Sequence, residues 1–367
     1  MNDNLTRYFA IQKALMSLRP VQAKGNIARH LNTLGMLVSG IVGSQKCHLP
    51  SIARKVPASG KPQSRVRKME RWLHNARIDV ETYYQPYVQA LLKSLPPTPL
   101  VLVIDGSEVG RGCVLLSINV VYERRALPLY WRVVKGKKGY LPEATHIEVV
   151  KKAATLLPQV RTVVFLGDGE FDGVELLKTL QGLGWNYVCR TAKNVLLTEE
   201  GERFKPTDLM LQPGDRIELP EVGFTASEYG PVLVSVIWEP EWTEPLVLVS
   251  NMEFLEEEYD WYKRRFRIET FFSDQKSRGF YLGHSHISDV EALNRLLIAT
   301  CLAYLWLVCL GQWVVQTGRL SWIHRADRCD WSLFRIGLAW IEFCLNEDLP
   351  IWTQFAIPKK GEQKSVG

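Results

Sequence analysis

Two stretches decide the fold of this chain: LVLVIDGS at residues 100–107 and RTVVFLGDG at residues 161–169. Each begins with a run of apolar and β-branched residues, which predicts a buried strand. Each run is followed by an aspartate and a glycine, so that Asp105 and Asp168 are expected at strand ends. Reactive groups in open α/β sheets gather beyond strand ends, although turns also favour aspartate for local reasons. We therefore expect the two carboxylates to meet in one crevice.

The segments around these stretches predict an α/β sheet with an antiparallel start. Three strands come first and are followed by alternating helices and strands. The further strands are expected at residues 113–121, 126–134 and 185–189, and the helices at 144–157 and 175–183. Residues 194–250 are rich in Pro, Gly and short strand-like runs, which indicates a β-rich insertion. Residues 252–276 then return to a helical pattern.

The chain divides at a proline-rich stretch, residues 96–99, because prolines end helices and favour extended connectors. Residues 1–97 read as an all-helical domain, residues 98–345 as a catalytic domain, and residues 346–367 as a C-terminal tail. Residues 1–97 hold 15 Lys/Arg and 4 Asp/Glu, a net charge of +11, whereas the whole chain carries +6. Such a basic N-terminal part is expected to bind a polyanion.

Within this part, residues 49–56 and 64–74 read as two helices flanking a Pro- and Gly-containing turn. Such a pair resembles a helix-turn-helix DNA reader. The cations of its second helix are the candidate DNA contacts: Arg65, Arg67, Lys68 and Arg71. The alternative is an ordinary helical hairpin with a solvated basic face.

A second constellation lies in the helical segment that follows the insertion. Tyr262, Arg265, Glu269 and Lys276 fall within one narrow stripe of an ideal helix, because they are spaced by 3, 4 and 7 residues. Glu269 stands among several Lys and Arg residues, which suits a site that receives phosphates and metal ions. The alternative is a solvated helix with Glu–Lys pairs. Aromatic residues at 266, 271 and 272 favour a packed helix whose stripe faces a cleft.

YKRRFRIETFFSDQK, residues 262–276, matches the Tyr-x2-Arg-x3-Glu-x6-Lys motif of DDE transposases of the insertion sequence family four type. IDGSEV at 104–109 and GDGEFDG at 167–173 resemble the two aspartate motifs of that family, and KSRGF at 276–280 is typical of it as well. The resemblance covers residues 98–310, whereas the N-terminal part matches only in general layout.

This resemblance implies an RNase H-like catalytic core: a mixed sheet flanked by helices, with a β-rich insertion before the glutamate helix. It implies cut-and-paste movement of an insertion sequence by DNA strand cleavage and strand transfer. Asp105, Asp168 and Glu269 then resemble the triad that binds two Mg²⁺ ions, with Mn²⁺ as a substitute. Tyr262, Arg265 and Lys276 resemble the contacts to DNA-end phosphates. Glu170 and Asp172 remain second choices for the middle acid.

The partners implied are double-stranded DNA, both the terminal inverted repeats of the element and its target, and a second copy of the chain. Relatives with this layout stack a tryptophan of the insertion on a flipped base, and such stacking is worth about 1–3 kcal/mol per base. Trp238, after the run VLVSVI, is the first candidate, because a strand end holds a ring rigidly. Trp242 is the second.

Other features of the sequence narrow the class of protein. It contains no GxxxxGK[ST] motif, so no nucleotide cofactor is expected. Its seven cysteines form no CxxC pair and predict reduced thiols in a cytoplasmic, nucleoid-associated protein of bacterial type. The first twenty residues do not resemble a signal peptide. The uncharged segment 298–315 is interpreted as a buried core helix rather than a membrane span.

Two other functions stay open at this point. One is a structure-specific DNA nuclease on the same fold, and the other is a non-catalytic DNA-binding relative. Acids at all three triad positions argue against the non-catalytic relative, and the Tyr-Arg-Glu-Lys stripe argues against the nuclease.

Overall fold

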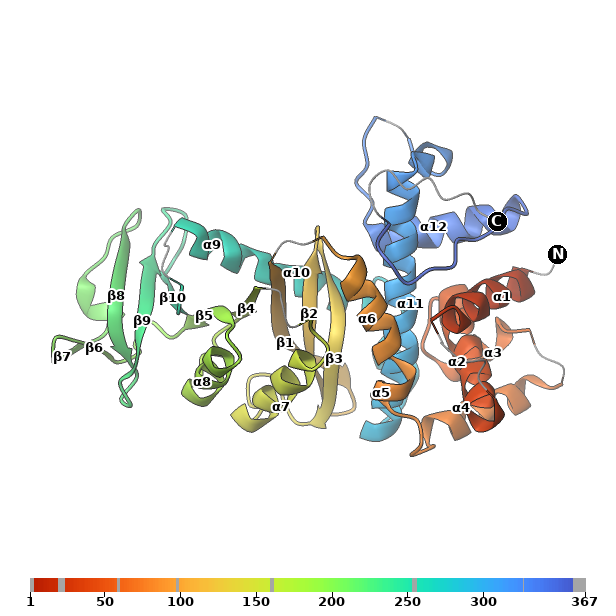
Figure 1. Cartoon of the computed structure of the whole chain (residues 1–367), viewed down its shortest axis with the longest axis horizontal. Coiled ribbons are helices and arrows are strands. Elements are labelled where there is room, and N and C mark those ends of the chain that lie inside the picture. Colours follow the sequence, from red (N-terminus) through yellow and green to blue (C-terminus); the bar gives the residue numbers. More distant parts are fainter. Residues whose placement is uncertain are drawn as a thin grey trace.

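The computed structural model describes residues 3–18, 24–57, 60–96, 99–158, 162–252, 256–325 and 327–358. Within them, one ten-stranded mixed sheet is formed by strands between residues 100 and 250, in the order β3-β2-β1-β4-β5-β10-β9-β8-β6-β7. Figure 1 shows an elongated molecule, in which the sheet extends from β6 and β7 at one end toward the N-terminal helices at the other. A mixed α/β fold with helices flanking the sheet was expected and is confirmed.

The described residues before the sheet form helices and no strand. They comprise α1 (Asp3–Met16), α2 (Gly25–Ser44), α3 (Leu49–Arg54), α4 (Pro62–Leu73), α5 (Val80–Tyr83) and α6 (Gln85–Ser94). The predicted helix pair is present as α3 and α4, each one or more residues shorter at its C-terminal end than expected. Helices α2 and α4 pack against the later helix α11 (Val290–Gln316), so the N-terminal part shares its apolar core with the C-terminal part.

The first half of the sheet follows the predicted order. Strands β1 (Leu100–Gly110), β2 (Cys113–Tyr122) and β3 (Arg125–Lys135) pair antiparallel, and β4 (Val163–Gly167) and β5 (Asn186–Thr191) continue parallel to β1. Helices α7 (Glu143–Ala154) and α8 (Val174–Gly182) connect these strands. Every strand and helix predicted between residues 100 and 191 is therefore found.

From the sequence we expected strand β1 to end at Asp105, but the strand continues to Gly110. Its parallel neighbour β4 stops at Gly167, with Leu166 opposite Val103. On its other side, β1 keeps pairing with β2, and Asp105 lies opposite Ser117. Asp105 thus lies beyond the parallel pairing but inside the antiparallel one, and the hairpin with β2 is the physical reason for the extension.

The predicted insertion belongs to the same sheet. It consists of β6 (Leu197–Glu199), β7 (Glu202–Phe204), β8 (Arg216–Phe224), β9 (Tyr229–Ile237) and β10 (Leu246–Ser250). Strand β10 pairs with both β5 and β9, which joins the added strands to the edge of the first half. The insertion therefore extends the central sheet instead of forming a separate small core.

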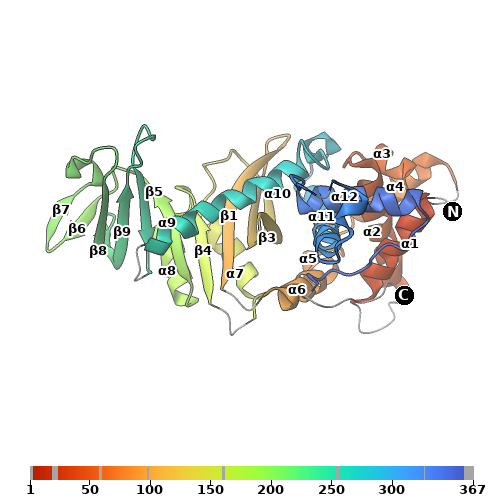
Figure 2. The ribbon, with the colours of Figure 1, turned by 90° about the horizontal axis from the view of Figure 1, so that it is seen from above.

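The predicted helical segment after the insertion is interrupted once. It contains α9 (Glu256–Lys263), a 3-10 turn η2 (Arg264–Phe266) and α10 (Arg267–Gln275). Figure 2 shows α9 and α10 lying in one line across the sheet, toward α11. Helix α10 contacts β1, β2 and β3, which carries Glu269 across to the strand that holds Asp105.

Helix α11 is long and apolar enough to cross a membrane by length and composition alone, but 94% of its apolar window is buried inside the protein. It packs on α12 (Leu333–Asn346) so closely that a Cβ atom at Gly337 would lie 2.1 Å from the carbonyl oxygen of Leu307. The interpretation as a buried core helix agrees with this packing. Of the predicted tail, residues up to 358 are described, and Trp352 and Phe355 are buried in the core.

Candidate active site

The three acids of the predicted triad come from three different elements. Asp105 lies in β1 and is buried, Asp168 directly follows β4, and Glu269 lies in the first turn of α10 with a side chain that is 62% exposed. The parallel pairing of β1 with β4 and the contact of α10 with β1 bring these elements to one place. The sequence places each acid on an element, and the sheet topology gathers them.

Arg265 joins the three acids. Its guanidinium lies 3.8 Å from Asp105 Oδ2, 4.0 Å from Asp168 Oδ2 and 4.0 Å from Glu269 Oε1. Arg265 is itself buried, and its Nε has no hydrogen-bond partner among the described residues. A buried cation needs opposite charge close by, because desolvation of an isolated ion is costly. The carboxylates and the guanidinium therefore stabilise one another.

A second cation at the site, Lys138, was not predicted. Its Nζ lies 2.8 Å from Asp105 Oδ1, which also accepts the backbone N–H of Gly106 at 2.7 Å. Burial raises the pKa of Asp105, and Lys138 acts in the opposite direction. The basic run KGKKG at residues 135–139, directly after a predicted strand, was the one signal in the sequence that could have revealed it.

Lys276 follows α10, is half-buried, and interacts electrostatically with Asp105. Burial lowers its pKa, and the neighbouring ammonium of Lys138 acts in the same direction, whereas Glu108 and Asp105 raise it. The structure therefore brings Lys276 into the electrostatic surroundings of Asp105, while its contact with DNA-end phosphates stays a prediction.

The two second choices for the middle acid point to other partners. Glu170 accepts the backbone N–H of Gly139 at 3.2 Å, and its carboxylate lies 3.6 Å from His146 Nε2, slightly beyond hydrogen-bond distance. Asp172 accepts the hydroxyl of Thr191 at 2.6 Å, and burial raises its pKa. Since Asp168 shares Arg265 with the other acids, the geometry favours it for the middle position.

Beside the acids lies a pocket of about 460 Å³. The residues that matter here are aromatic or cationic and come from β5, the insertion and the segment α9–η2: Arg190, Trp242, Tyr259, Tyr262, Arg265 and Phe266. Tyr262 is almost fully buried, with its ring 5.8 Å from the Arg265 guanidinium. The ring of Trp242 meets that of Tyr259 edge-on at 5.9 Å. The pocket thus lies between the insertion and Arg265, the cation that pairs with the acids.

Trp238, our first choice for an aromatic facing the site, does not line this pocket. Its backbone N–H donates to the carbonyl of Asp215, and its indole N–H donates to the carbonyl of Trp242 at 3.0 Å. The indole is therefore engaged with its own loop and not with the pocket. Trp242, the second choice, is the tryptophan that lines the pocket.

Of the four cations predicted to contact DNA from α4, Arg65 has an intramolecular role. Its guanidinium donates to the carbonyls of Ala53, Val56 and Gly60 and so fastens the turn between α3 and α4. These bonds argue against the expectation that it faces DNA, because each of these carbonyls belongs to the end of α3 or to the turn after it.

The other three cations are placed differently. Arg67 and Arg71 are exposed, and Lys68 leans on α2, with its Nζ 3.4 Å from Asn32 Oδ1. Lys68 and Arg71 line a groove of about 690 Å³ between α2 and α4, together with Arg29 and other polar residues. The cations therefore lie both in the groove between α2 and α4 and on the exposed surface of α4.

No three His, Cys, Asp or Glu residues lie close enough to hold a metal ion as the described residues stand. The donor set nevertheless fits one. Three carboxylates lie within 4.0 Å of a single guanidinium cation, and carboxylate oxygens are the hard ligands that Mg²⁺ prefers. The cysteines give no alternative site among the described residues, because none of them belongs to a group of three possible metal ligands.

Comparison with known proteins bears on this site. Residues 143–306 match the family model described as the transposase DDE domain, a range that contains Asp168 and Glu269 and begins after Asp105. This match supports a DDE transposase, a class of DNA-cleaving enzymes. No curated protein matches the sequence.

Among solved structures, the chain is similar to the piggyBac transposase in its synaptic complex with hairpin DNA, with 11% identity, a TM-score of 0.44, and coverage of 100% of this chain and 87% of that one. It is also similar to human ENDOV, with 13% identity, a TM-score of 0.24, and coverage of 60% and 95%. Likenesses this low support no conclusion about activity.

Proposed function

We propose that this protein is a transposase of the insertion sequence family four type, which excises and inserts an element by DNA strand cleavage and strand transfer. The observation that carries the proposal is the convergence of Asp105, Asp168 and Glu269 on Arg265. Isolated surface ion pairs contribute little to stability, whereas clusters of ionisable groups that share a buried cation are a feature of functional sites.

The sheet supports an RNase H-like core. Strands β3, β2 and β1 are antiparallel, β4 and β5 follow parallel to β1, and the extra strands come between β5 and the helix that carries Glu269. This is the layout that the resemblance implies. The first two acids lie where β1 and β4 part, which is where an α/β sheet opens a crevice.

Asp105, Asp168 and Glu269 would hold two Mg²⁺ ions, with Mn²⁺ as a substitute. When bound, such ions lower the pKa of the attacking hydroxyl and balance charge on the leaving oxygen. The protein's own cations surround the acids and would hold the phosphates of the DNA strand. Arg265 is the central one, Lys276 flanks Asp105, and the buried Tyr262 packs beside Arg265 and limits its motion.

The N-terminal helices would bind the terminal inverted repeats of the element. Their net charge of +11 favours DNA, and Arg67, Arg71 and Lys68 lie on or beside the groove between α2 and α4. Acting on two element ends requires two active sites, so we propose a homodimer in the DNA complex. The reduced, mostly buried thiols agree with a cytoplasmic, nucleoid-associated protein.

The test is to incubate the purified chain and Mg²⁺ with duplexes that carry the DNA flanking its coding sequence. The 3′ ends released and any joined products are then mapped. Asp105→Asn, Asp168→Asn and Glu269→Gln should each slow cleavage by at least about 10³-fold, because each removes charge stabilisation at the reacting phosphate. Asp172→Asn is the matched control for the middle acid and should keep cleaving.

The outcomes separate the three candidate functions. Cut ends that join a target duplex support a transposase, whereas cutting without joining supports a nuclease. Binding without cutting, in wild-type protein supplied with Mg²⁺ or Mn²⁺, would leave only a DNA-binding relative. Wild-type rates in any one of the triad variants would remove that residue from the site.

A further inference from the structure

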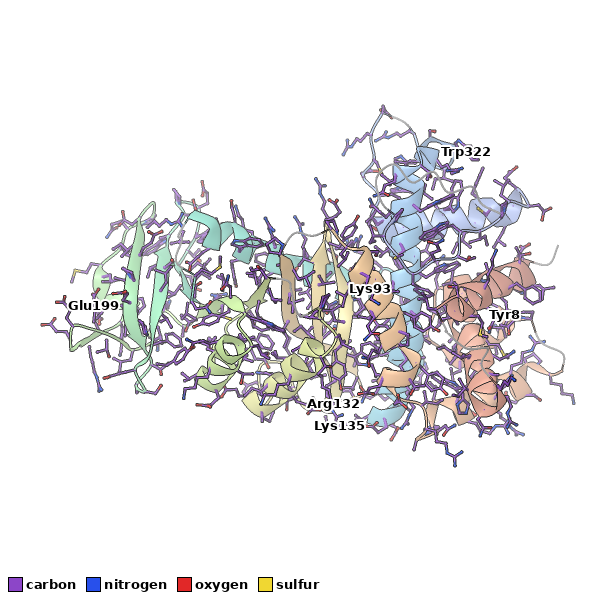
Figure 3. The ribbon with its side chains drawn as sticks, in the orientation of Figure 1. Tyr8, Lys93, Arg132, Lys135, Glu199 and Trp322 are labelled. Carbon is purple, nitrogen blue, oxygen red and sulfur yellow. The ribbon has the colours of Figure 1, made fainter. Side chains whose placement is uncertain are left out.

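The loop between β3 and α7 brings Lys138 to the buried carboxylate of Asp105. It begins at Lys135, which lies at the lower end of β3 in Figure 3 and whose Nζ donates to the carbonyl of Arg111 at 2.9 Å. The backbone N–H of Gly136 donates to the carbonyl of Gly112 at 3.1 Å. These bonds tie the start of the loop to the β1–β2 turn.

The next turn of the loop is held by Glu170, which accepts the N–H of Gly139. Gly139 has a φ of +84°, which favours glycine, so the chain reverses directly after Lys138. Tyr140 follows with a largely exposed ring, which shows that the loop projects from the sheet. The fold therefore presents Lys138 at the rim of the acid site.

Lys138 and Asp105 form an unequal pair. The carboxylate side chain is 4% exposed, whereas the lysine side chain is 44% exposed. The ammonium thus reaches Asp105 from the solvent side, where a DNA strand entering the site has to pass. A flexible four-carbon stem can move its charge by several ångströms without moving the loop.

Resting on the function proposed above, we propose that Lys138 is a strand-binding residue that pairs with Asp105 only while DNA is absent. When a strand enters, a phosphate oxygen accepts the ammonium in place of the carboxylate. This exchange frees Asp105 for a divalent cation, so that DNA and metal each favour the binding of the other. By linkage, the factor by which DNA tightens metal binding equals the factor by which metal tightens DNA binding.

The test measures the affinity of the full chain for Mn²⁺ alone, from the electron paramagnetic resonance signal of free Mn²⁺. The same titration is then repeated with a saturating duplex of mixed sequence. Lys138→Met should bind Mn²⁺ about fivefold more tightly than wild type when DNA is absent, because a competing cation is gone. DNA should then tighten Mn²⁺ binding less in this variant than in wild type.

Two further variants keep the measurement interpretable. Lys178→Met is the matched control, because Lys178 also makes a 2.8 Å pair with a carboxylate, Glu175, and is 51% exposed, but lies on α8. It should behave as wild type in both titrations. Lys138→Arg keeps the charge and should restore most of the coupling, which a purely structural role of the loop would not explain.

Two results would overturn this inference alone, provided that the wild type binds Mn²⁺ and cuts DNA. One is an unchanged Mn²⁺ affinity of Lys138→Met. The other is an increase in Mn²⁺ affinity on DNA binding that is as large in Lys138→Met as in Lys178→Met. Wild-type protein that binds neither Mn²⁺ nor DNA would overturn the proposed function together with it.

Discussion

Replacement of Arg125 by methionine tests how the helix that carries Glu269 is fixed to the sheet. Arg125 is the first residue of β3, and its Nη1 donates to Asp274 Oδ2 in α10 at 2.5 Å. The two side chains are only 11% and 7% exposed. Asp274 lies five residues after Glu269 on the same helix, so the ion pair fastens that helix to the strand.

The magnitude follows from burial. Removing one partner of a buried ion pair leaves an uncompensated charge and costs about 3–5 kcal/mol. That is a large share of a total free energy of unfolding of about 5–15 kcal/mol. We therefore expect Arg125→Met to fold only marginally at neutral pH and to lose cleavage activity as α10 loosens.

The cost should depend on pH in a defined direction. Burial raises the pKa of Asp274 from its usual 3.8 to about 6, although Arg125 and Arg278 act the other way. Without Arg125 this pKa rises further. The folded state then holds a proton that the unfolded state releases, so stability is fully present below about pH 4 and is lost as pH rises through the folded pKa. The deficit of the variant should shrink as pH falls, by at most about 1.4 kcal/mol per pH unit.

Urea unfolding at pH 5 and pH 8 measures both effects. Arg132→Met is the matched control on the same strand, because Arg132 makes a half-exposed pair with Glu148 at 3.9 Å. It should cost less than about 1 kcal/mol at either pH. A deficit for Arg125→Met that is below 1 kcal/mol, or equal at the two pH values, would refute the reasoning.

Two further predictions concern residues whose placement differed from expectation. Arg65→Met should lower the free energy of unfolding by about 2 kcal/mol, since it removes bonds to three carbonyls, and should leave the salt dependence of DNA binding unchanged. Arg67→Met should instead reduce the slope of log DNA affinity against log salt concentration by about one unit and leave the free energy of unfolding unchanged. Equal slopes in both variants would contradict this assignment. Trp242→Ala should bind and nick element DNA but stall before strand joining, with partial rescue by an abasic site at the flipped nucleotide. Trp238→Ala should give normal product ratios, and a stall in this variant alone would restore our first choice.

The sequence was sufficient for the parts of the fold that depend on local pattern. Apolar runs of strand length gave β1 to β5, and Asp168 follows β4 because the run before it ends in glycine. The spacing of Arg265 and Glu269 placed both on one face, and this survives the 3-10 turn between α9 and α10. In each case the deciding interactions lie within a few residues of chain.

The misplaced residues depend on partners far away in the chain or on how a loop turns. Asp105 lies inside a longer strand because β2 pairs with it, which a local pattern cannot show. Lys138 reaches Asp105 through a loop whose path is set by Glu170 and by the β1–β2 turn. Arg65 was counted as a free cation because nothing in the sequence reveals that its guanidinium folds back onto the end of α3.

The charge of the site explains why its cations belong there. Among the groups ion-paired within 4.0 Å, Asp105, Asp168 and Glu269 bring three formal negative charges, and Arg265 and Lys138 bring two positive ones, which leaves a formal charge of −1. Fully unpaired acids at this depth would repel one another and pull the crevice apart. A single divalent cation would change the sign of the site to +1, which favours a phosphate, and a bound phosphate would in turn favour a second cation. The resting ion pairs therefore keep the acids together in the free protein, and they become surplus only when both DNA and metal are present.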